Sequence, residues 1–151
     1  MAMTNLRLGD DFQAFLKLLE LHGVKYLVVG GYAVALHGYP RSTGDFDVFI
    51  EQSNENGLKI LKVIDEFGFD ISEFDNLNFE EEPIAFFMGQ PPHKIDVISK
   101  ISGISFEDAY PKRIEIEISD MIIPFIGLNE LKINKKESGR LKDLNDLEHL
   151  P

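Results

Sequence analysis

The fold is decided by residues 27–50, LVVGGYAVALHGYPRSTGDFDVFI. An apolar run at 26–29 predicts a strand buried on both faces, and the glycines Gly30 and Gly31 break it. A short helix is expected at 32–37 and a second strand at 46–51. Strand, glycine pair and helix in this order can hold an anion, because glycine lets the backbone approach a phosphate and the first N–H groups of a helix point at it. A plain turn gives the same pattern, so the glycines alone leave both interpretations open.

Two aspartates, Asp45 and Asp47, stand at the start of the second strand. Residues two apart on a strand face the same side, so their carboxylates lie side by side. Two like charges this close need a cation, and hard carboxylate oxygens suit Mg²⁺ or Mn²⁺. A third aspartate, Asp96, interrupts an apolar strand predicted at 94–100, where a lone charge is costly to bury. If the two strands are neighbours, three carboxylates converge; the alternatives are a solvated turn at Asp45 and a frayed strand end at Asp96.

The rest of the chain supplies further helices and strands around these segments. Apolar spacing predicts helices at 10–22, 55–67 and about 128–150. Strands are predicted at 84–88, 114–118 and 121–126 in addition to those above. Helices flanking a mainly buried sheet indicate an α/β or α+β class with a mixed sheet. With no repeat or long linker, the 151 residues are expected to form a single domain, 1–151.

The amino-acid composition excludes several kinds of site and disfavours some partners. The chain has no cysteine, which excludes disulfides, thiolate metal sites and cysteine nucleophiles. Neither a signal peptide nor an apolar run of the ~20 residues that span a bilayer is evident, so we expect a cytoplasmic protein without a membrane partner. With 15 basic and 26 acidic residues the net charge is −11, which disfavours binding of long polyanions.

The basic residues are nevertheless concentrated in one segment. Residues 132–142, KINKKESGRLK, contain five of the fifteen, which an even distribution does not produce. A chain that repels anions overall but gathers cations at one place is suited to one particular anion. A solvated basic helix end is the alternative.

Together these motifs resemble the signature of the DNA polymerase β-like nucleotidyltransferase superfamily. In that signature a glycine pair is followed by Asp-x-Asp and by a third Asp on a later strand, the position of Asp96 here. The segment RSTGDFD at 41–47 is similar to the branch that includes the AbiEii-like toxins and many small relatives. Residues 134–147 resemble the closing motif of that branch, N-K-x-x-x-G-R-x-K-D-x-x-D.

The resemblance implies a palm-like fold and transfer of a nucleoside monophosphate from an NTP to an acceptor, with release of pyrophosphate. It makes Asp45, Asp47 and Asp96 the catalytic residues and the ligands of Mg²⁺ or Mn²⁺. Residues implied to bind the nucleotide are Gly30, Gly31, Arg41, Thr43, Lys135, Arg140 and Lys142. Lys135 is implied as the leading phosphate contact, with Arg140 and Lys142 either assisting it or pairing with Asp143 and Asp146.

The implied acceptor is a tRNA, a protein or a small molecule. Larger members of the superfamily carry a helical domain that contributes to acceptor binding, so the resemblance implies an acceptor site here that is either incomplete or supplied by a partner protein or by a second copy in a homodimer. Two other functions stay open. One is a non-catalytic nucleotide-binding or interaction module of a toxin–antitoxin pair, and the other is a nucleotide-sugar binder of the Asp-x-Asp glycosyltransferase kind, for which 151 residues is short.

Overall fold

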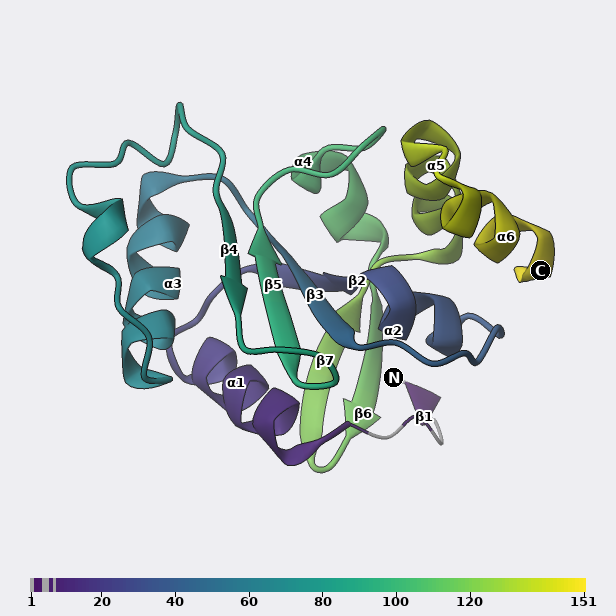
Figure 1. The fold of residues 1–151 in the computed structure, drawn as a ribbon, viewed down its shortest axis with the longest axis horizontal. Coiled ribbons are helices and arrows are strands. Elements are labelled where there is room, and N and C mark those ends of the chain that lie inside the picture. Colours follow the sequence, from purple (N-terminus) through teal and green to yellow (C-terminus); the bar gives the residue numbers. More distant parts are fainter. Residues whose placement is uncertain (1, 4–5, 7) are drawn as a thin grey trace.

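The computed structural model describes residues 2, 3, 6 and 8–151, and its centre is one mixed sheet of seven strands (Figure 1). The strands lie in the order β1-β6-β7-β2-β3-β5-β4. Their bounds are β1 Ala2–Met3, β2 Tyr26–Val29, β3 Asp45–Ile50, β4 Ala85–Met88, β5 Lys94–Ile98, β6 Ile114–Ile118 and β7 Met121–Phe125. The mixed α/β class predicted from the sequence is confirmed, whereas the single domain over 1–151 stays a prediction.

Helices connect the strands and cover parts of the sheet. Their bounds are α1 Asp10–Leu21, α2 Gly30–Leu36, α3 Asn54–Glu66, α4 Phe106–Ala109, α5 Leu128–Ser138 and α6 Leu141–His149, with short 3-10 turns η1 Ser72–Phe74 and η2 Tyr110–Lys112. Within the described part of the chain, no helix is both long and apolar enough to cross a bilayer.

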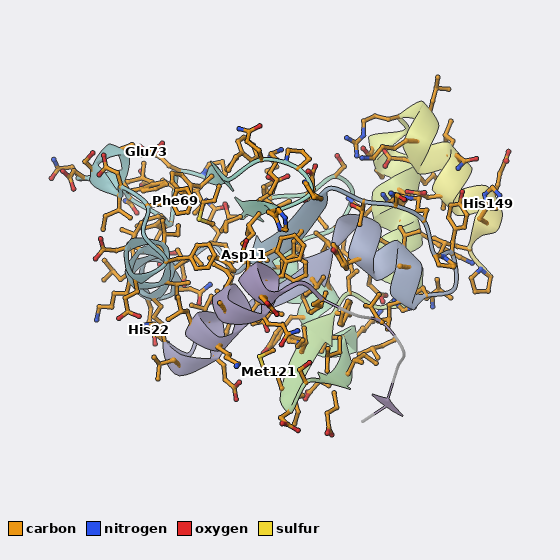
Figure 2. The ribbon with its side chains drawn as sticks, turned by 60° about the horizontal axis from the view of Figure 1, so that its bottom comes forward. Asp11, His22, Phe69, Glu73, Met121 and His149 are labelled. Carbon is orange, nitrogen blue, oxygen red and sulfur yellow. The ribbon has the colours of Figure 1, made fainter. Side chains whose placement is uncertain are left out.

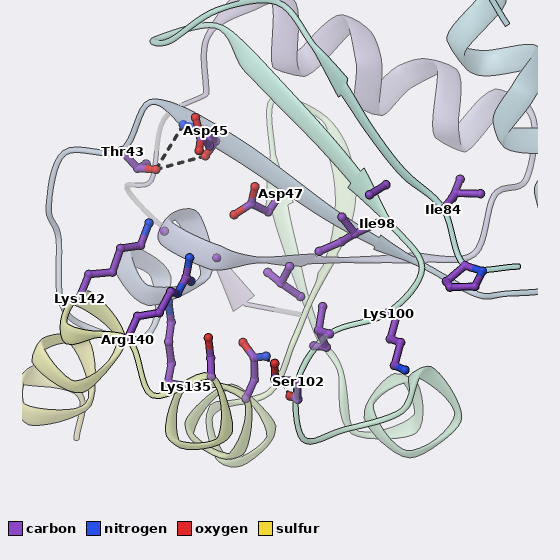
Figure 3. Close-up of a pocket in the computed structure, with 18 residues that line it drawn as sticks. Thr43, Asp45, Asp47, Ile84, Ile98, Lys100, Ser102, Lys135, Arg140 and Lys142 are labelled. Atoms are coloured by element: carbon purple, nitrogen blue, oxygen red, sulfur yellow. Dashed lines mark hydrogen bonds between the residues drawn. The ribbon is translucent and has the colours of Figure 1, made fainter. Parts of the chain in front are cut away.

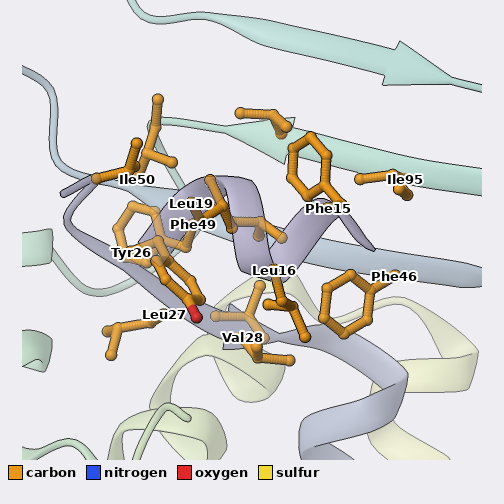
Figure 4. Packing of buried hydrophobic residues seen from close by; sticks show 14 of the residues in the cluster. Phe15, Leu16, Leu19, Tyr26, Leu27, Val28, Phe46, Phe49, Ile50 and Ile95 are labelled. Carbon is orange, nitrogen blue, oxygen red and sulfur yellow. The ribbon is translucent and has the colours of Figure 1, made fainter. Parts of the chain in front are cut away.

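Much of the core lies between the sheet and α1. Phe15, Leu16 and Leu19 fall on one face of α1 and are buried, and Figure 4 shows them beside side chains of the central strands such as Phe46 and Ile95. Each fully buried side chain of this size stabilises the fold by ~1.5–3 kcal/mol. α3 packs beside α1, whereas α5 and α6 lie at the other end of the molecule, near His149 (Figure 2).

The other face of the central strands is where polar residues collect. Because side chains alternate along a strand, Phe46 faces α1 while Asp45, Asp47 and Phe49 face away from it. Phe49 packs edge-on against Phe106 of α4, with 5.3 Å between ring centroids. α4 therefore covers one end of β3 on this side, and the end with the two aspartates borders a cavity.

Several elements of the structure differ from the sequence predictions, and three of these differences bear on the architecture. α2 begins at Gly30 rather than at Tyr32, because a glycine with φ of +69° turns the chain from strand to helix within one residue. The helix predicted over about 128–150 is two helices, since Gly139 adopts a left-handed φ of +64° that ends α5. The two-residue strand β1, which pairs in parallel with β6, was not predicted.

Candidate active site

Three aspartates converge where β3 and β5 lie side by side. The strands are parallel neighbours, and their register pairs Asp47 with Asp96. Asp45, two residues before Asp47, faces the same side. One carboxylate oxygen from each of the three lies within 4.8 Å of the others. The strands are thus neighbours as the sequence prediction required, and the metal-binding and catalytic roles of the three residues stay predictions.

Asp96 is the most enclosed of the three carboxylates, at 9% exposure. Its Oδ1 accepts no hydrogen bond from the residues that the structure describes, although Lys94 Nζ lies 3.2 Å away. An enclosed carboxylate oxygen without a hydrogen bond is costly, and a metal ion relieves that cost. The all-oxygen set and its unsatisfied member therefore fit a hard divalent cation such as Mg²⁺ or Mn²⁺.

The electrostatics of the triad show how strongly it needs positive charge. Burial, a hydrogen bond with Asp96, and the charges of Asp96 and Asp45 together raise the pKa of Asp47 to about 7, while Lys142 acts in the opposite sense. A hydrogen bond to Asp96 also raises the pKa of Lys94. Three carboxylate charges at this spacing repel one another, and a bound cation would offset that repulsion.

The glycine pair brings the backbone against the triad. A Cβ on Gly30 would lie 2.0 Å from Asp47 Oδ2, and one on Gly31 would lie 2.6 Å from Thr43 Oγ1. Gly30 also adopts a positive φ, which a residue with a side chain rarely takes. Both positions therefore require glycine, and both glycines line the cavity beside the aspartates.

The loop before β3 is fixed by two side chains. The Thr43 hydroxyl donates to the Asp45 carbonyl at 3.2 Å and accepts from the Asp45 N–H at 3.4 Å, which holds the first residue of the strand. Arg41 forms a two-pronged ion pair with Asp146 of α6, with Nε 2.8 Å from Oδ1 and Nη2 2.9 Å from Oδ2. Thr43 lines the cavity, and Arg41 is turned toward α6. Their roles in nucleotide binding stay predictions.

Lys135 lies in a buried ion-pair network. Its side chain is 3% exposed, and its Nζ lies 3.2 Å from Asp143 Oδ1 and 3.0 Å from Asp146 Oδ2. Arg140 Nε donates to Asp143 Oδ2 at 2.7 Å. Of the two arrangements that the sequence left open for Arg140, pairing with an aspartate of α6 is present. The role of Lys135 as a phosphate contact stays a prediction.

The network shifts the acidity of its carboxylates. Burial alone would raise the pKa of Asp143, but hydrogen bonds from Arg140, Ser138 and Lys135 outweigh it and hold that pKa well below its usual range. In the same way hydrogen bonds from Arg41 and Lys135 overcome the burial of Asp146 and lower its pKa. Both carboxylates are therefore charged at neutral pH and tie α5, α6 and the Arg41 loop together.

The cavity extends from the aspartates to the cations of α5 and α6 (Figure 3). Its volume is about 640 Å³, within the range of small-molecule sites. Lys142 and Arg140 border it across from Asp47, and the glycine pair also lines it. Its other end is lined by apolar side chains and a few polar ones, among them Pro83, Ile84, Ile98, Ile101, Ser102 and Asn134.

Comparison with known proteins identifies the family. Residues 10–150 match the family described as "Nucleotidyltransferase of unknown function (DUF6036)". The chain belongs to this nucleotidyltransferase family. No curated protein matches it in sequence.

Solved structures agree with this nucleotidyltransferase assignment at the level of the fold. One is the "putative nucleotidyltransferase" TM1012 from Thermotoga maritima, at a TM-score of 0.60 and 18% identity, covering 91% of this chain and 88% of that one. Another is the lincosamide antibiotic adenylyltransferase LnuA with lincomycin bound, at a TM-score of 0.61 and 17% identity, covering 96% and 97%. The prediction of a nucleotidyltransferase is thereby confirmed by the family match, and the two solved structures share the fold of this chain. The protein is a nucleotidyltransferase enzyme.

Two features of this nucleotidyltransferase were not found from the sequence. Lys94 contacts the triad, and the two-residue period that links it to Asp96 was a usable signal. The apolar end of the cavity combines Ile84, Ile98 and Ile101 from separate segments. No local sequence pattern unites those three residues, because only the fold brings them together.

Proposed function

We propose that this nucleotidyltransferase transfers a nucleoside monophosphate from an NTP to an acceptor hydroxyl and releases pyrophosphate, with Mg²⁺ or Mn²⁺ at the triad. The observation that carries the proposal is the convergence of Asp45, Asp47 and Asp96, together with an Asp96 oxygen that accepts no hydrogen bond within the described part of the chain. Bound divalent ions would supply Lewis-acid activation of the acceptor oxygen and neutralise the charge of the leaving group. All three carboxylates are present and adjacent, which favours catalysis over a purely interacting module.

The three carboxylates have different roles in this proposal. Asp45 and Asp47 lie on the same strand beside the glycine turn, and they would bind the metal ion jointly with the nucleotide. Asp96, paired across the sheet with Asp47, orients the acceptor hydroxyl and accepts its proton. Positioning and charge neutralisation account for most of the rate, since phosphoryl transfer needs little covalent participation from the protein.

The triphosphate lies between the glycine turn and the cations. The absence of side chains at Gly30 and Gly31 lets Asp47 and Thr43 pack against the turn, and both glycines line the cavity that the triphosphate would enter. Thr43 fixes the loop that borders it. Arg140 and Lys142 line the opposite wall, where two positive charges face the phosphates. Lys135 acts indirectly, because its ion pair with Asp143 belongs to the network that positions Arg140.

The nucleoside occupies the apolar end of the cavity. Ile84, Ile98 and Ile101 offer a surface suited to a base. The net charge of −11 favours a small or cationic acceptor over a long nucleic acid. A homodimer or partner protein that completes the acceptor side is compatible with this arrangement.

The proposal is tested by titrating each NTP calorimetrically into the metal-free protein, with Mg²⁺ and then with EDTA. Asp45→Asn and Asp47→Asn are compared with Asp120→Asn, which makes the same change at an exposed turn outside the site. We expect metal-dependent binding that both site variants lose and the control keeps. A screen of hydroxyl-bearing acceptors with labelled NTP then identifies what is modified.

Three outcomes contradict the proposal. Nucleotide binding that is indifferent to EDTA would show that the carboxylates do not hold a metal with the nucleotide. Transfer activity of the wild-type size in Asp45→Asn or Asp47→Asn would remove the triad from the mechanism. If the folded protein binds no nucleotide at all, the non-catalytic interaction module becomes the better description.

A further inference from the structure

Lys94 places a positive charge inside the aspartate triad. It is the first residue of β5, two residues before Asp96 and directly opposite Asp45 in the register of β3. Its Nζ lies 3.2 Å from Asp96 Oδ1, 3.4 Å from Asp96 Oδ2 and 3.9 Å from Asp45 Oδ2. Among the described residues, Lys94 is the one basic residue in an ion pair with the triad.

This lysine neutralises the triad only in part. Three carboxylates gather within 4.8 Å, and a single ammonium group offsets one of their charges. Asp96 Oδ1 accepts no hydrogen bond among the described residues even though Nζ is 3.2 Å away, so the ammonium is close but poorly aligned. A compact divalent cation between the carboxylates would satisfy all three, and it would carry one more charge than the ammonium.

The Lys94 ammonium also has a second position available to it, beside the Phe87 ring. Its Nζ already lies 4.9 Å from the centroid of the Phe87 ring, and Phe87 is 59% exposed on the edge strand β4. The register places Phe87 opposite Asp96, on the outer side of the triad. Since the Lys94 side chain is itself 28% exposed, its ammonium can turn toward this ring and the solvent while staying hydrated.

We propose that Lys94 is a resident counter-ion of the metal site, so that metal loading is an exchange in which a divalent cation displaces the Lys94 ammonium from the carboxylates toward Phe87. The inference rests on the proposed metal site. The exchange favours divalent over monovalent ions, because a monovalent ion brings no more charge than the ammonium that it replaces. Lys94 holds the carboxylates together before loading and lowers the affinity of the site for every cation.

The test measures Mn²⁺ binding to the metal-free protein by the loss of the free-ion signal in electron paramagnetic resonance. Lys94→Met removes the counter-ion, and Lys94→Gln is a second variant that keeps a polar side chain. Lys100→Met is the matched control, because Lys100 lines the same cavity and forms no ion pair with the triad among the described residues. Asp45→Asn reports that the binding measured is at the triad.

We expect Lys94→Met and Lys94→Gln to bind Mn²⁺ about tenfold more tightly than the wild type, and Lys100→Met to stay within about twofold. In thermal melts, the rise in Tm on adding Mn²⁺ should be larger in both Lys94 variants. Equal or weaker Mn²⁺ affinity in the Lys94 variants overturns the counter-ion role and leaves the metal site standing. If no protein, wild-type or variant, binds Mn²⁺, the metal site and the counter-ion role both fall.

Discussion

Replacing Lys135 by methionine should destabilise the fold by about 3 kcal/mol, because it leaves two buried carboxylates without their shared cation. The ammonium lies 3.2 Å and 3.0 Å from oxygens of Asp143 and Asp146, and those side chains are 0% and 1% exposed. Breaking one partner out of a buried ion pair costs ~3–5 kcal/mol. The lower end applies here, since Arg140 and Arg41 still pair with the two carboxylates.

The assay is urea unfolding followed by circular dichroism, with Lys136→Met as the control on the exposed side of the same helix. We expect a lower midpoint with an unchanged slope for Lys135→Met, a fall in Tm of roughly 6–12 °C, and almost no change in the control. A stability within about 0.5 kcal/mol of the wild type would refute the reasoning. A stable Lys135→Met that no longer binds NTP would assign the lysine to the phosphates directly.

Three further predictions concern charge and backbone at the site. In EDTA, wild-type stability should fall as pH rises from about 4 to about 7 and level off above that, because over this range Asp47 is ionised in the unfolded chain but keeps its proton in the folded one, where its pKa is raised to about 7. Asp47→Asn should remove this fall and stabilise the protein by about 1–3 kcal/mol at pH 8, as measured by urea unfolding. The lowered pKa values of Asp143 and Asp146 contribute stability above pH ~4 that is lost on acidification; acid titrations followed by circular dichroism should show a shallower loss in Asp146→Asn, and an identical profile would argue against the network. Gly30→Ala should cost at least ~1 kcal/mol from its positive φ and abolish NTP binding by pressing on Asp47, as measured in melts and by calorimetry. Gly9→Ala, at the N-cap of α1 with open space around it, should leave NTP binding unchanged.

The carboxylate triad could be predicted from the sequence because local patterns mark each of its members. The two-residue period of a strand puts Asp45 and Asp47 on one face. A single charged residue in an apolar run marks Asp96, since burying a lone charge requires a partner. Only the adjacency of β3 and β5 had to be supplied by the fold, and the family resemblance made it a reasonable expectation.

The basic segment was harder to interpret from the sequence. Its residues include both buried and exposed cations, and nothing in the spacing separates Lys135 from Lys142. Leucines recur every three residues in α6, which is typical of an apolar inner face, yet Leu141 and Leu144 are exposed while Asp143 and Asp146 are buried. The inner face of α6 is ionic because Lys135 and Arg41, from two other segments, form ion pairs with its buried aspartates. That condition depends on tertiary structure and cannot be inferred from the periodicity of one helix.

The ion pair between Arg41 and Asp146 joins residues that are 105 positions apart. The ribosome synthesises the chain from its N-terminus, so the loop that carries Thr43 is made long before α6. Until then the loop lacks the contact that fixes it, and the cations of α5 and α6 are missing from the cavity. In the proposed nucleotide site, a nascent chain without α6 would therefore lack both the ion pair that fixes the Thr43 loop and the Lys142 charge that faces the phosphates, so nucleotide binding would begin only once α6 is made.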